Sequence, residues 1–323
     1  MPSLRLVWSL SRLALVTCVT LNVGDNPPDL SLSPPACWVF THNNKAGGTT
    51  VKTHLRNYAE ARNQTLAVFH GGSYKSGDKG IQNLLDNKPA LIAGGYTEGL
   101  RTTAYQRCTW FTMMRHPIAR LISAFYYCSG GSRDQLCAAN IHKPEDGDIY
   151  DFAEHWGNYA LMQFALGVVD QKEILAQEVD APAWYKTKLY LEGLLGYPGK
   201  TSSAAKHTTH DEWQSEWIPK LLLPVEELLR SNYAAVGILE HWQKSMTLFD
   251  HALEIPGFNW TVASASLAPQ KSQKEMTEKK AMLAAAMTDS VLRQYVWLDM
   301  LLYEYACSLH KEQLSRLVGA YVP

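Results

Sequence analysis

The sequence has almost no excess of charge of either sign. Of its 323 residues, 30 are Lys or Arg and 31 are Asp or Glu, which gives a formal net charge of -1 at pH 7. Proteins that bind DNA, RNA or a long polyanion across a broad surface rely on many Lys and Arg contacts. We therefore expect no nucleic-acid partner, and any binding site for an anion must be local.

The sequence also lacks closely spaced cysteines. None of its six cysteines forms a C-x-x-C pair, the spacing typical of zinc and redox sites, so we expect no metal site. Cys128 and Cys137 flank the Ser- and Gly-rich residues 129–132, which could fold back and allow a disulfide in an oxidising compartment. Two ordinary buried thiols are the alternative.

The N-terminal apolar run is too short to cross a bilayer on its own. Residues 13–23 form a run of 11 residues, whereas a membrane-spanning helix needs about 20. Arg5 and Arg12 precede this run, as in a signal peptide or a short signal anchor. A surface helix or a poorly ordered tail is the alternative. We expect residues 1–36 to be a signal or anchor segment with a linker, and residues 37–323 to be the folded domain.

Two N-glycosylation sequons support entry into the secretory pathway. Residues 63–65 read N-Q-T, and residues 259–261 read N-W-T. Together with the N-terminal segment, they favour a secreted or lumenal protein.

Short apolar runs alternate with segments of helical periodicity along the rest of the chain. The expected strands are residues 37–41, 66–69, 90–93, 108–114 and 234–239. The expected helices are residues 49–62, a helix that begins at Pro117, segments within 150–195, and residues 242–253 and 289–317. The polar stretches 129–150, 196–210 and 261–280 are expected to be surface loops or solvated faces. This alternation predicts an α/β fold with a central parallel sheet flanked by helices.

The loop after the first expected strand has the composition of an anion site. Residues 45–50 read K-A-G-G-T-T and lie between a strand and a helix, where backbone N–H groups and the helix dipole favour a bound phosphate. Lys45 adds a positive charge, and Thr49 and Thr50 add hydroxyl donors. A simple turn with a helix cap is the alternative.

A second anion site is expected after the strand at 108–114. Arg115 follows that strand directly, and Ser123 lies two turns along the next helix, so a guanidinium and a hydroxyl could hold another phosphate. Ligands of parallel sheets bind at the carboxyl ends of the strands, which places the two loops side by side. A purely structural Arg115 is the alternative.

Together the two segments resemble motifs of the sulfotransferase superfamily, especially its Golgi carbohydrate branch. That family's first motif often reads H-I-P-K-T-G-G-T-S, and residues 42–50 read H-N-N-K-A-G-G-T-T. The second, R-D-P-x-x-R-x-x-S-x-Y/F, stands as R-H-P-I-A-R-L-I-S-A-F at residues 115–125. The clear match covers residues 37–128, and weaker resemblance continues at residues 236–240 and 299–304.

The resemblance implies a P-loop-like three-layer fold and a metal-free transfer of a sulfuryl group from 3′-phosphoadenosine 5′-phosphosulfate (PAPS) to a hydroxyl. The acceptor would be a glycan, and the protein would act in the Golgi lumen, either free or held by a single-pass anchor. Arg115 and Ser123 would bind the 3′-phosphate of PAPS. The residues that would hold the 5′-phosphosulfate are Lys45, Ala46, Gly47, Gly48, Thr49 and Thr50. Lys45 would also face the charge that develops on the leaving phosphate.

Two departures from the family pattern concern the second motif and the proton acceptor. His116 stands where the family has Asp, which removes a carboxylate beside Arg115. Several members also carry a catalytic His or Glu near the strand exit that corresponds to Gly94 and Gly95. The candidates here are Glu98 and His70, because either side chain can accept a proton.

Two other functions share the expected layout. A P-loop kinase fits poorly, because no G-x-x-x-x-G-K-[ST] is present and Arg115 stands where an Asp for Mg²⁺ would be expected. A noncatalytic nucleotide- or glycan-binding relative would keep the fold without a base.

Overall fold

The computed structural model describes residues 37–69, 86–95, 97–129, 137, 149–169, 217–260 and 273–318. The predictions for residues 1–36 and 196–210, most of 129–150 and His70 lie outside these ranges. The described strands are β1 (Trp38–Thr41), β2 (Leu66–Phe69), β3 (Leu91–Gly94), β4 (Thr109–Met114) and β5 (Tyr233–Ile238). The described α-helices are α1 (Gly48–Ala61), α4 (Pro117–Ser129), α5 (Ile149–Trp156), α6 (Tyr159–Ala165), α10 (Leu223–Asn232), α11 (Trp242–Leu253), α12 (Gln273–Thr288), α13 (Ser290–Tyr295) and α14 (Trp297–Val318).

The strands form one five-stranded parallel sheet in the order β2-β3-β1-β4-β5. All five strands coincide with the apolar runs that the sequence predicts, to within one residue at either end. Parallel strands buried on both faces have continuous apolar sequences, which makes them easy to locate. β1 lies in the middle, between β3 and β4, so the chain reverses its direction of winding there.

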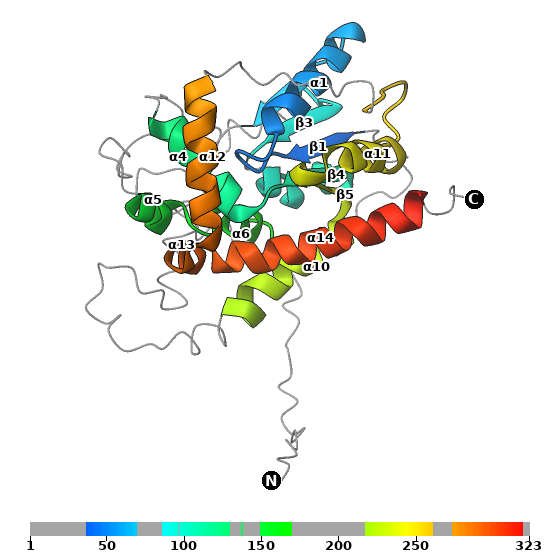
Figure 1. The fold of residues 1–323 in the computed structure, drawn as a ribbon. Helices are drawn as coiled ribbons and strands as arrows, with labels where there is room; N and C mark the ends of the chain where they lie inside the picture. The colour runs from blue at the N-terminus through cyan, green and yellow to red at the C-terminus, as the bar shows by residue number, and fades with distance from the viewer. Residues whose placement is uncertain are drawn as a thin grey trace, which may run out of the picture. The chain divides into compact units, whose positions relative to one another are not determined.

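Helices cover both faces of the sheet, and side chains alternate between two cores (Figure 1). Phe40 and Phe111 pack with residues of α1 and α11 on one face. Their neighbours Val39 and Trp110 pack with residues of α4, α6, α10 and α14 on the other. This alternation follows from the two-residue period of a strand. The predicted three-layer α/β fold is therefore confirmed.

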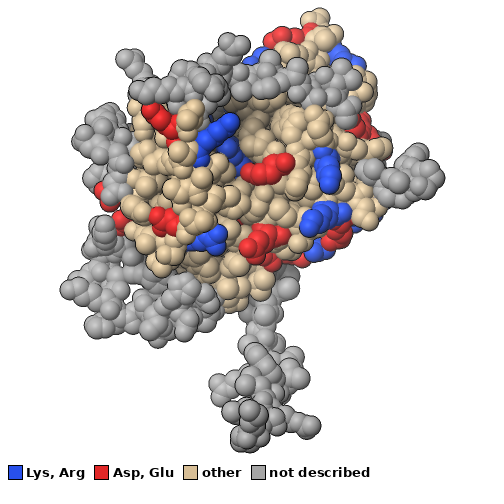
Figure 2. Space-filling model, in the orientation of Figure 1, with Lys and Arg blue, Asp and Glu red and all other residues tan. Residues whose placement is uncertain are grey.

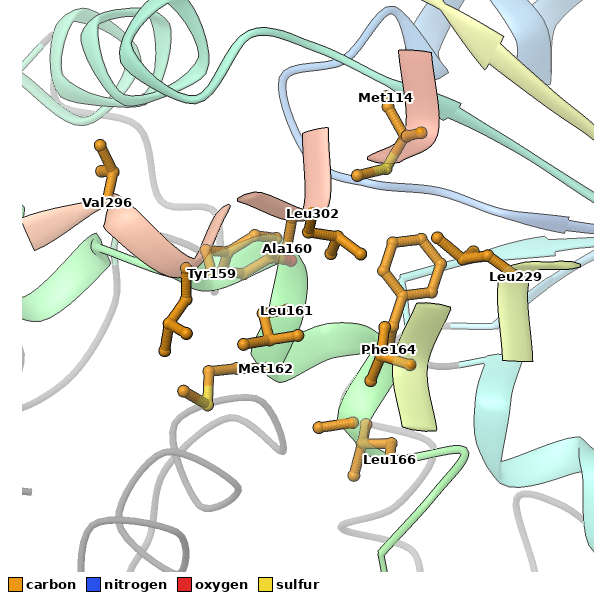
Figure 3. Close-up of a cluster of buried hydrophobic side chains, with 14 of the residues drawn as sticks. Met114, Tyr159, Ala160, Leu161, Met162, Phe164, Leu166, Leu229, Val296 and Leu302 are labelled. Carbon is orange, nitrogen blue, oxygen red and sulfur yellow. The ribbon is translucent and has the colours of Figure 1, made fainter. Parts of the chain in front are cut away.

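Helix α6 is buried on every side. All its residues from Tyr159 to Ala165 are buried, and Figure 3 shows them among apolar side chains of neighbouring elements, such as Leu229 and Leu302. The helix follows a break at Gly157 and Asn158, where Asn158 has the left-handed φ of 54°. A side chain at Gly157 would overlap the carbonyl of Tyr295.

The C-terminal region differs from the expectation in two ways. The single helix expected at 289–317 is two helices, α13 and α14, with a break at Val296. The polar stretch 261–280, expected to be a solvated face, includes the first half of a 16-residue helix, α12, which begins at Gln273. Its mixed charges hid the helix, because only a few side chains of α12 pack against the core, those of Met282, Leu283, Ala286 and Met287.

Two disulfides lie within the described residues. Cys128–Cys137 is the pairing that the sequence left open. Cys37–Cys108 was not predicted, since 71 positions separate the two cysteines. These residues directly precede the neighbouring strands β1 and β4, so their Cα atoms are 4.9 Å apart. Among the described helices, none is both long enough and apolar enough for a membrane crossing.

Candidate anion-binding site

The two predicted anion loops lie next to each other at the carboxyl ends of β1 and β4. A guanidinium N–H of Arg115 (Nη1) donates to the backbone carbonyl of Lys45 at 2.9 Å. β1 and β4 are neighbours, so the residues that follow them meet at one edge of the sheet. Residues that are 70 positions apart in the sequence thus lie next to each other, as the parallel α/β pattern predicts.

The loop before α1 presents the start of a helix without a side-chain cap. Helix α1 begins at Gly48, and Gly47 in the N-cap position has the left-handed φ of 81°. None of the described side chains caps this end of the helix. The first N–H groups of any α-helix have no partner inside the helix, and they carry the positive end of its dipole. Gly48, Thr49 and Thr50 occupy this first turn, which suits an anionic ligand.

The two glycines of this loop lie so close to neighbouring side chains that there is little room for a Cβ atom at either position. A methyl group on Gly48 would overlap the imidazole ring of His42, and one on Gly47 would lie 2.9 Å from a methyl carbon of Leu239. The ring of His42 therefore packs directly against the backbone of the first helical turn. This contact gives His42, the first residue of the motif, a role in shaping the loop.

The side chain of Lys45 extends toward α4. Its Nζ lies 3.7 Å from the centre of the Tyr127 ring, a cation–π contact. Lys45 itself has a positive φ of 67°. The ammonium group thus lies between the loop and the helix that carries Ser123.

The second half of the site contains a lysine that the sequence argument missed. Ser123 on α4 is buried, and its hydroxyl accepts a hydrogen bond from Nζ of Lys279 on α12 at 3.3 Å. Lys279 belongs to the polar stretch interpreted as a solvated face. No local signal separates it from Lys280, because only the packing of α12 against α4 selects the lysine that faces inward.

A carboxylate near Arg115 comes from the turn after β5, the strand next to β4. Glu240, in the turn after β5, accepts the backbone N–H of His116 at 3.1 Å and the hydroxyl of Tyr303 at 3.0 Å. Burial lowers the pKa of Arg115, and the negative charge of Glu240 opposes this shift. Burial also lowers the pKa of His116, which favours a neutral ring there. Glu240 therefore places a negative charge beside His116, where the family motif has an Asp.

Glu98, one of the two candidates for the base, is fully buried in a polar network. It lies in the 3₁₀ turn η1 (Thr97–Thr102) after β3, and its carboxylate accepts hydrogen bonds from Arg101 and from the hydroxyl of Tyr233. The hydroxyls of Thr41 and Tyr233 share another hydrogen bond at 2.7 Å. The role of Glu98 as base stays a prediction, and so does that of His70, which lies outside the described ranges.

The second arginine of the motif, Arg120, points into the protein core. Its Nη2 donates to the carbonyl of Trp156 at 3.0 Å and lies 3.5 Å from a carboxylate oxygen of Asp299. That carboxylate also accepts the backbone N–H groups of Ala160 and Leu161, at 3.1 and 2.8 Å, and so caps α6. Arg120 thus links α4 to α6 and does not take part in the anion site.

Charged side chains on the face that Figure 2 shows form small groups. Figure 2 shows Lys and Arg side chains in separate patches with acidic side chains beside them, and no continuous basic surface on this face. Within the described parts of the chain, no cluster of His, Cys, Asp and Glu side chains could hold a metal ion.

No protein-family model matches the chain, and no curated protein matches it in sequence. Its function must therefore be argued from the geometry of the site and from the motifs.

Proposed function

We propose that this protein is a sulfotransferase that moves a sulfuryl group from PAPS to a hydroxyl, on a carbohydrate acceptor. The observation that carries the proposal is the hydrogen bond from Arg115 to the carbonyl of Lys45. It brings together the two segments that resemble the sulfotransferase motifs. In this proposal they bind one ligand that has two separate anionic groups. PAPS is such a ligand, with a 3′-phosphate and a 5′-phosphosulfate.

In this proposal the first turn of α1 holds the 5′-phosphosulfate. The N–H groups of Gly48, Thr49 and Thr50 point toward the end of the helix and would donate to its oxygens. Lys45 would leave the ring of Tyr127 and approach the oxygen that bridges phosphorus and sulfur. As the bond between that oxygen and sulfur breaks, negative charge grows on the leaving phosphate, and the ammonium group stabilises it.

The 3′-phosphate would lie at the junction of α4 and α12. Ser123 and Lys279 offer a hydroxyl and an ammonium group there, and Arg115, which lies just before α4, would reach the same phosphate with its guanidinium. Lys279 and Ser123 already share a hydrogen bond, so a phosphate would find both donors pre-positioned. The acceptor oxygen forms the new bond to sulfur, and its proton passes to a base, for which Glu98 and His70 remain the candidates.

A noncatalytic nucleotide-binding relative is the second proposal, and the surroundings of Glu98 favour it. The carboxylate of Glu98 is buried and paired with Arg101, which leaves it poorly placed to take a proton from an acceptor. Transfer of labelled sulfate from PAPS to any member of a glycan and alcohol panel would contradict this second proposal. Nucleotide binding without transfer across the panel would support it.

We also propose that the protein works in an oxidising compartment, as the Golgi lumen is. The disulfides Cys37–Cys108 and Cys128–Cys137 support this, because such bonds are rare in reducing compartments. The two sequons give the same indication, and both Asn63 and Asn259 are exposed.

The test of the main proposal compares two nucleotides and two variants. The wild-type protein should bind 3′-phosphoadenosine 5′-phosphate more tightly than adenosine 5′-phosphate in calorimetric titrations. Arg115→Ala should weaken binding of the first by about 2–4 kcal/mol and abolish the preference, because it removes a charged contact from the 3′-phosphate. Lys45→Ala should lower kcat more than it raises KM for PAPS, since its partner gains charge only during transfer.

Arg115 also holds the carbonyl of Lys45, so Arg115→Ala needs a control. Lys279→Met leaves that hydrogen bond intact and should still reduce the preference for the 3′-phosphate. Equal affinity of the wild-type protein for the two nucleotides would overturn the proposal.

A further inference from the structure

Gln163, on the buried helix α6, contacts two of the loops at the site. Its side chain is fully buried, and its amide nitrogen (Nε2) donates to the carbonyl of His42 at 2.8 Å and to the carbonyl of Gly95 at 2.6 Å. His42 is the first residue of the anion-binding loop after β1. Gly95 follows β3 and leads to Glu98. One side chain therefore joins the ends of two neighbouring strands.

These contacts require a donor group with two hydrogens. Both partners are carbonyl oxygens, so the NH₂ side of the amide must face them. The other atom, Oε1, has no hydrogen-bond partner among the described residues. A carboxylate in the same place would direct an oxygen at two carbonyl oxygens, which is unfavourable unless the carboxyl group is protonated.

A second contact from the same helix supports the same loop. The hydroxyl of Tyr159 accepts a hydrogen bond from the side-chain amide of Asn44 at 2.6 Å. Asn44 lies in the anion-binding loop directly before Lys45. Because α6 is enclosed by the core and capped by Asp299, it offers a rigid support for these contacts.

We propose that Gln163 is a positioning residue for the candidate active site. It fixes the anion-binding loop relative to the loop after β3, and so sets where Lys45 and the first turn of α1 meet the nucleotide. This inference rests on the proposed function, because it takes the nucleotide to bind at that loop. Gln163 acts through backbone carbonyls and does not itself touch the nucleotide.

The experiment measures affinity for 3′-phosphoadenosine 5′-phosphate by calorimetry in the full-length protein at two pH values, about pH 8 and about pH 5.5. Gln163→Met keeps the length of the side chain and removes both hydrogen bonds, so affinity should fall about 10-fold or more. Gln163→Glu should bind as weakly at the higher pH. At the lower pH its carboxyl group gains a proton and can donate one hydrogen bond, so the ratio of its affinity to that of the wild type should rise.

Two comparisons separate positioning from general loss of structure. The ratio of Gln163→Met to wild type should not change with pH, because methionine does not titrate. Met162→Ala, on the same helix, should lower the thermal midpoint, since Met162 is buried in the core, and should leave nucleotide affinity near wild type. Should Gln163→Glu fail to fold, the affinity of Gln163→Met still decides the inference.

The outcomes distinguish this inference from the proposed function. If the wild-type protein binds the nucleotide and Gln163→Met binds it almost as tightly, the inference is overturned and the proposed function stands. A pH-independent ratio for a folded Gln163→Glu also overturns it. A wild-type protein that does not bind the nucleotide overturns the proposed function, and this inference with it.

Discussion

At the scale of single residues, Glu98 shows that a side chain which the sequence marks as a candidate base can lie in a buried polar network. The sequence places a carboxylate shortly after a strand exit, where a base is expected. In the fold, that carboxylate lies beside the last residue of β1, between Arg101 and Tyr233. Burial raises the pKa of the Tyr233 hydroxyl well above its usual value, so this tyrosine stays protonated and donates to Glu98.

We predict that Glu98→Gln lowers the free energy of unfolding by about 3 kcal/mol, because it leaves Arg101 without its buried counter-charge. Chemical denaturation followed by tryptophan fluorescence measures this loss. Glu60→Gln, an exposed position on α1, serves as the matched control and should leave the unfolding midpoint unchanged. An unaltered midpoint for Glu98→Gln, together with a loss of turnover of about 10²-fold, would instead identify Glu98 as the base.

The parts of the site that the sequence could predict are those with local signals. Arg115 directly follows one apolar strand, and Gly47 and Gly48 lie in the loop after another, so their place at one sheet edge follows from the α/β pattern. Lys279 and Gln163 carry no such signal. The first resembles any lysine of a solvated helix, and the second lies in a segment predicted only to be helical, so only tertiary packing identifies them.

At the scale of elements, α6 links the core to the anion-binding loop. Its first turn is capped by Asp299 from α14, and the side chain of Asn158 accepts the backbone N–H of Asp299 at 3.0 Å in return. The first turn of α14, which begins directly after the break at Val296, thus exchanges hydrogen bonds with the start of α6. The sequence showed helical periodicity on both sides, but not the break.

We predict that Asp299→Asn lowers the free energy of unfolding by about 3–5 kcal/mol, because Arg120 would remain charged and unpaired inside the core. It should also weaken nucleotide binding, since α6 supports the loop through Gln163 and Tyr159. Thermal unfolding and calorimetry measure the two effects.

The surface ion pair between Arg230 and Glu312 provides the control for this prediction. Both side chains are about half exposed, at 47% and 48%, so Glu312→Gln should change neither stability nor binding appreciably. Equal behaviour of Asp299→Asn and Glu312→Gln would contradict the role given to Asp299.

At the scale of the whole molecule, three histidines make stability depend on pH: His54 and His310 are buried, and His116 is partly buried. Burial lowers the pKa values of His54, His116 and His310 below the usual value of about 6.5. The unfolded chain therefore binds more protons than the folded protein in the range just below that value. Their contribution to stability is complete above about pH 6.5 and decreases as the pH falls toward the folded pKa values.

We accordingly predict that the urea midpoint decreases between about pH 7.5 and about pH 5.5, with disulfides intact. His310→Gln should reduce this dependence on pH, because it removes one of the three groups. A midpoint that rises over the same interval would contradict the prediction.

The sequons lie together, away from the anion site. Arg62 donates to the carbonyl of Pro256 at 3.0 Å, so the segments that carry Asn63 and Asn259 are in contact. Asn63 follows the C-terminal end of α1, whereas the anion-binding loop precedes its start, about 20 Å away along the helix. Glycans at these positions would leave the site open.

We predict that protein from a eukaryotic secretory host gains gel mobility after treatment with an N-glycosidase, and that Asn63→Gln with Asn259→Gln together abolish the shift. An unshifted band from such a host would contradict glycosylation at both positions.

The disulfide Cys37–Cys108 also determines how the protein responds to a broken backbone. It turns the chain from Cys37 to Cys108 into a closed ring that includes β1, α1, β2 and β3. A protease that nicks this ring once produces two chain ends but no separate fragments. The nicked protein would migrate as one species until a reductant opens the ring, and the loop with Lys45 would stay tethered to the strand that ends at Met114.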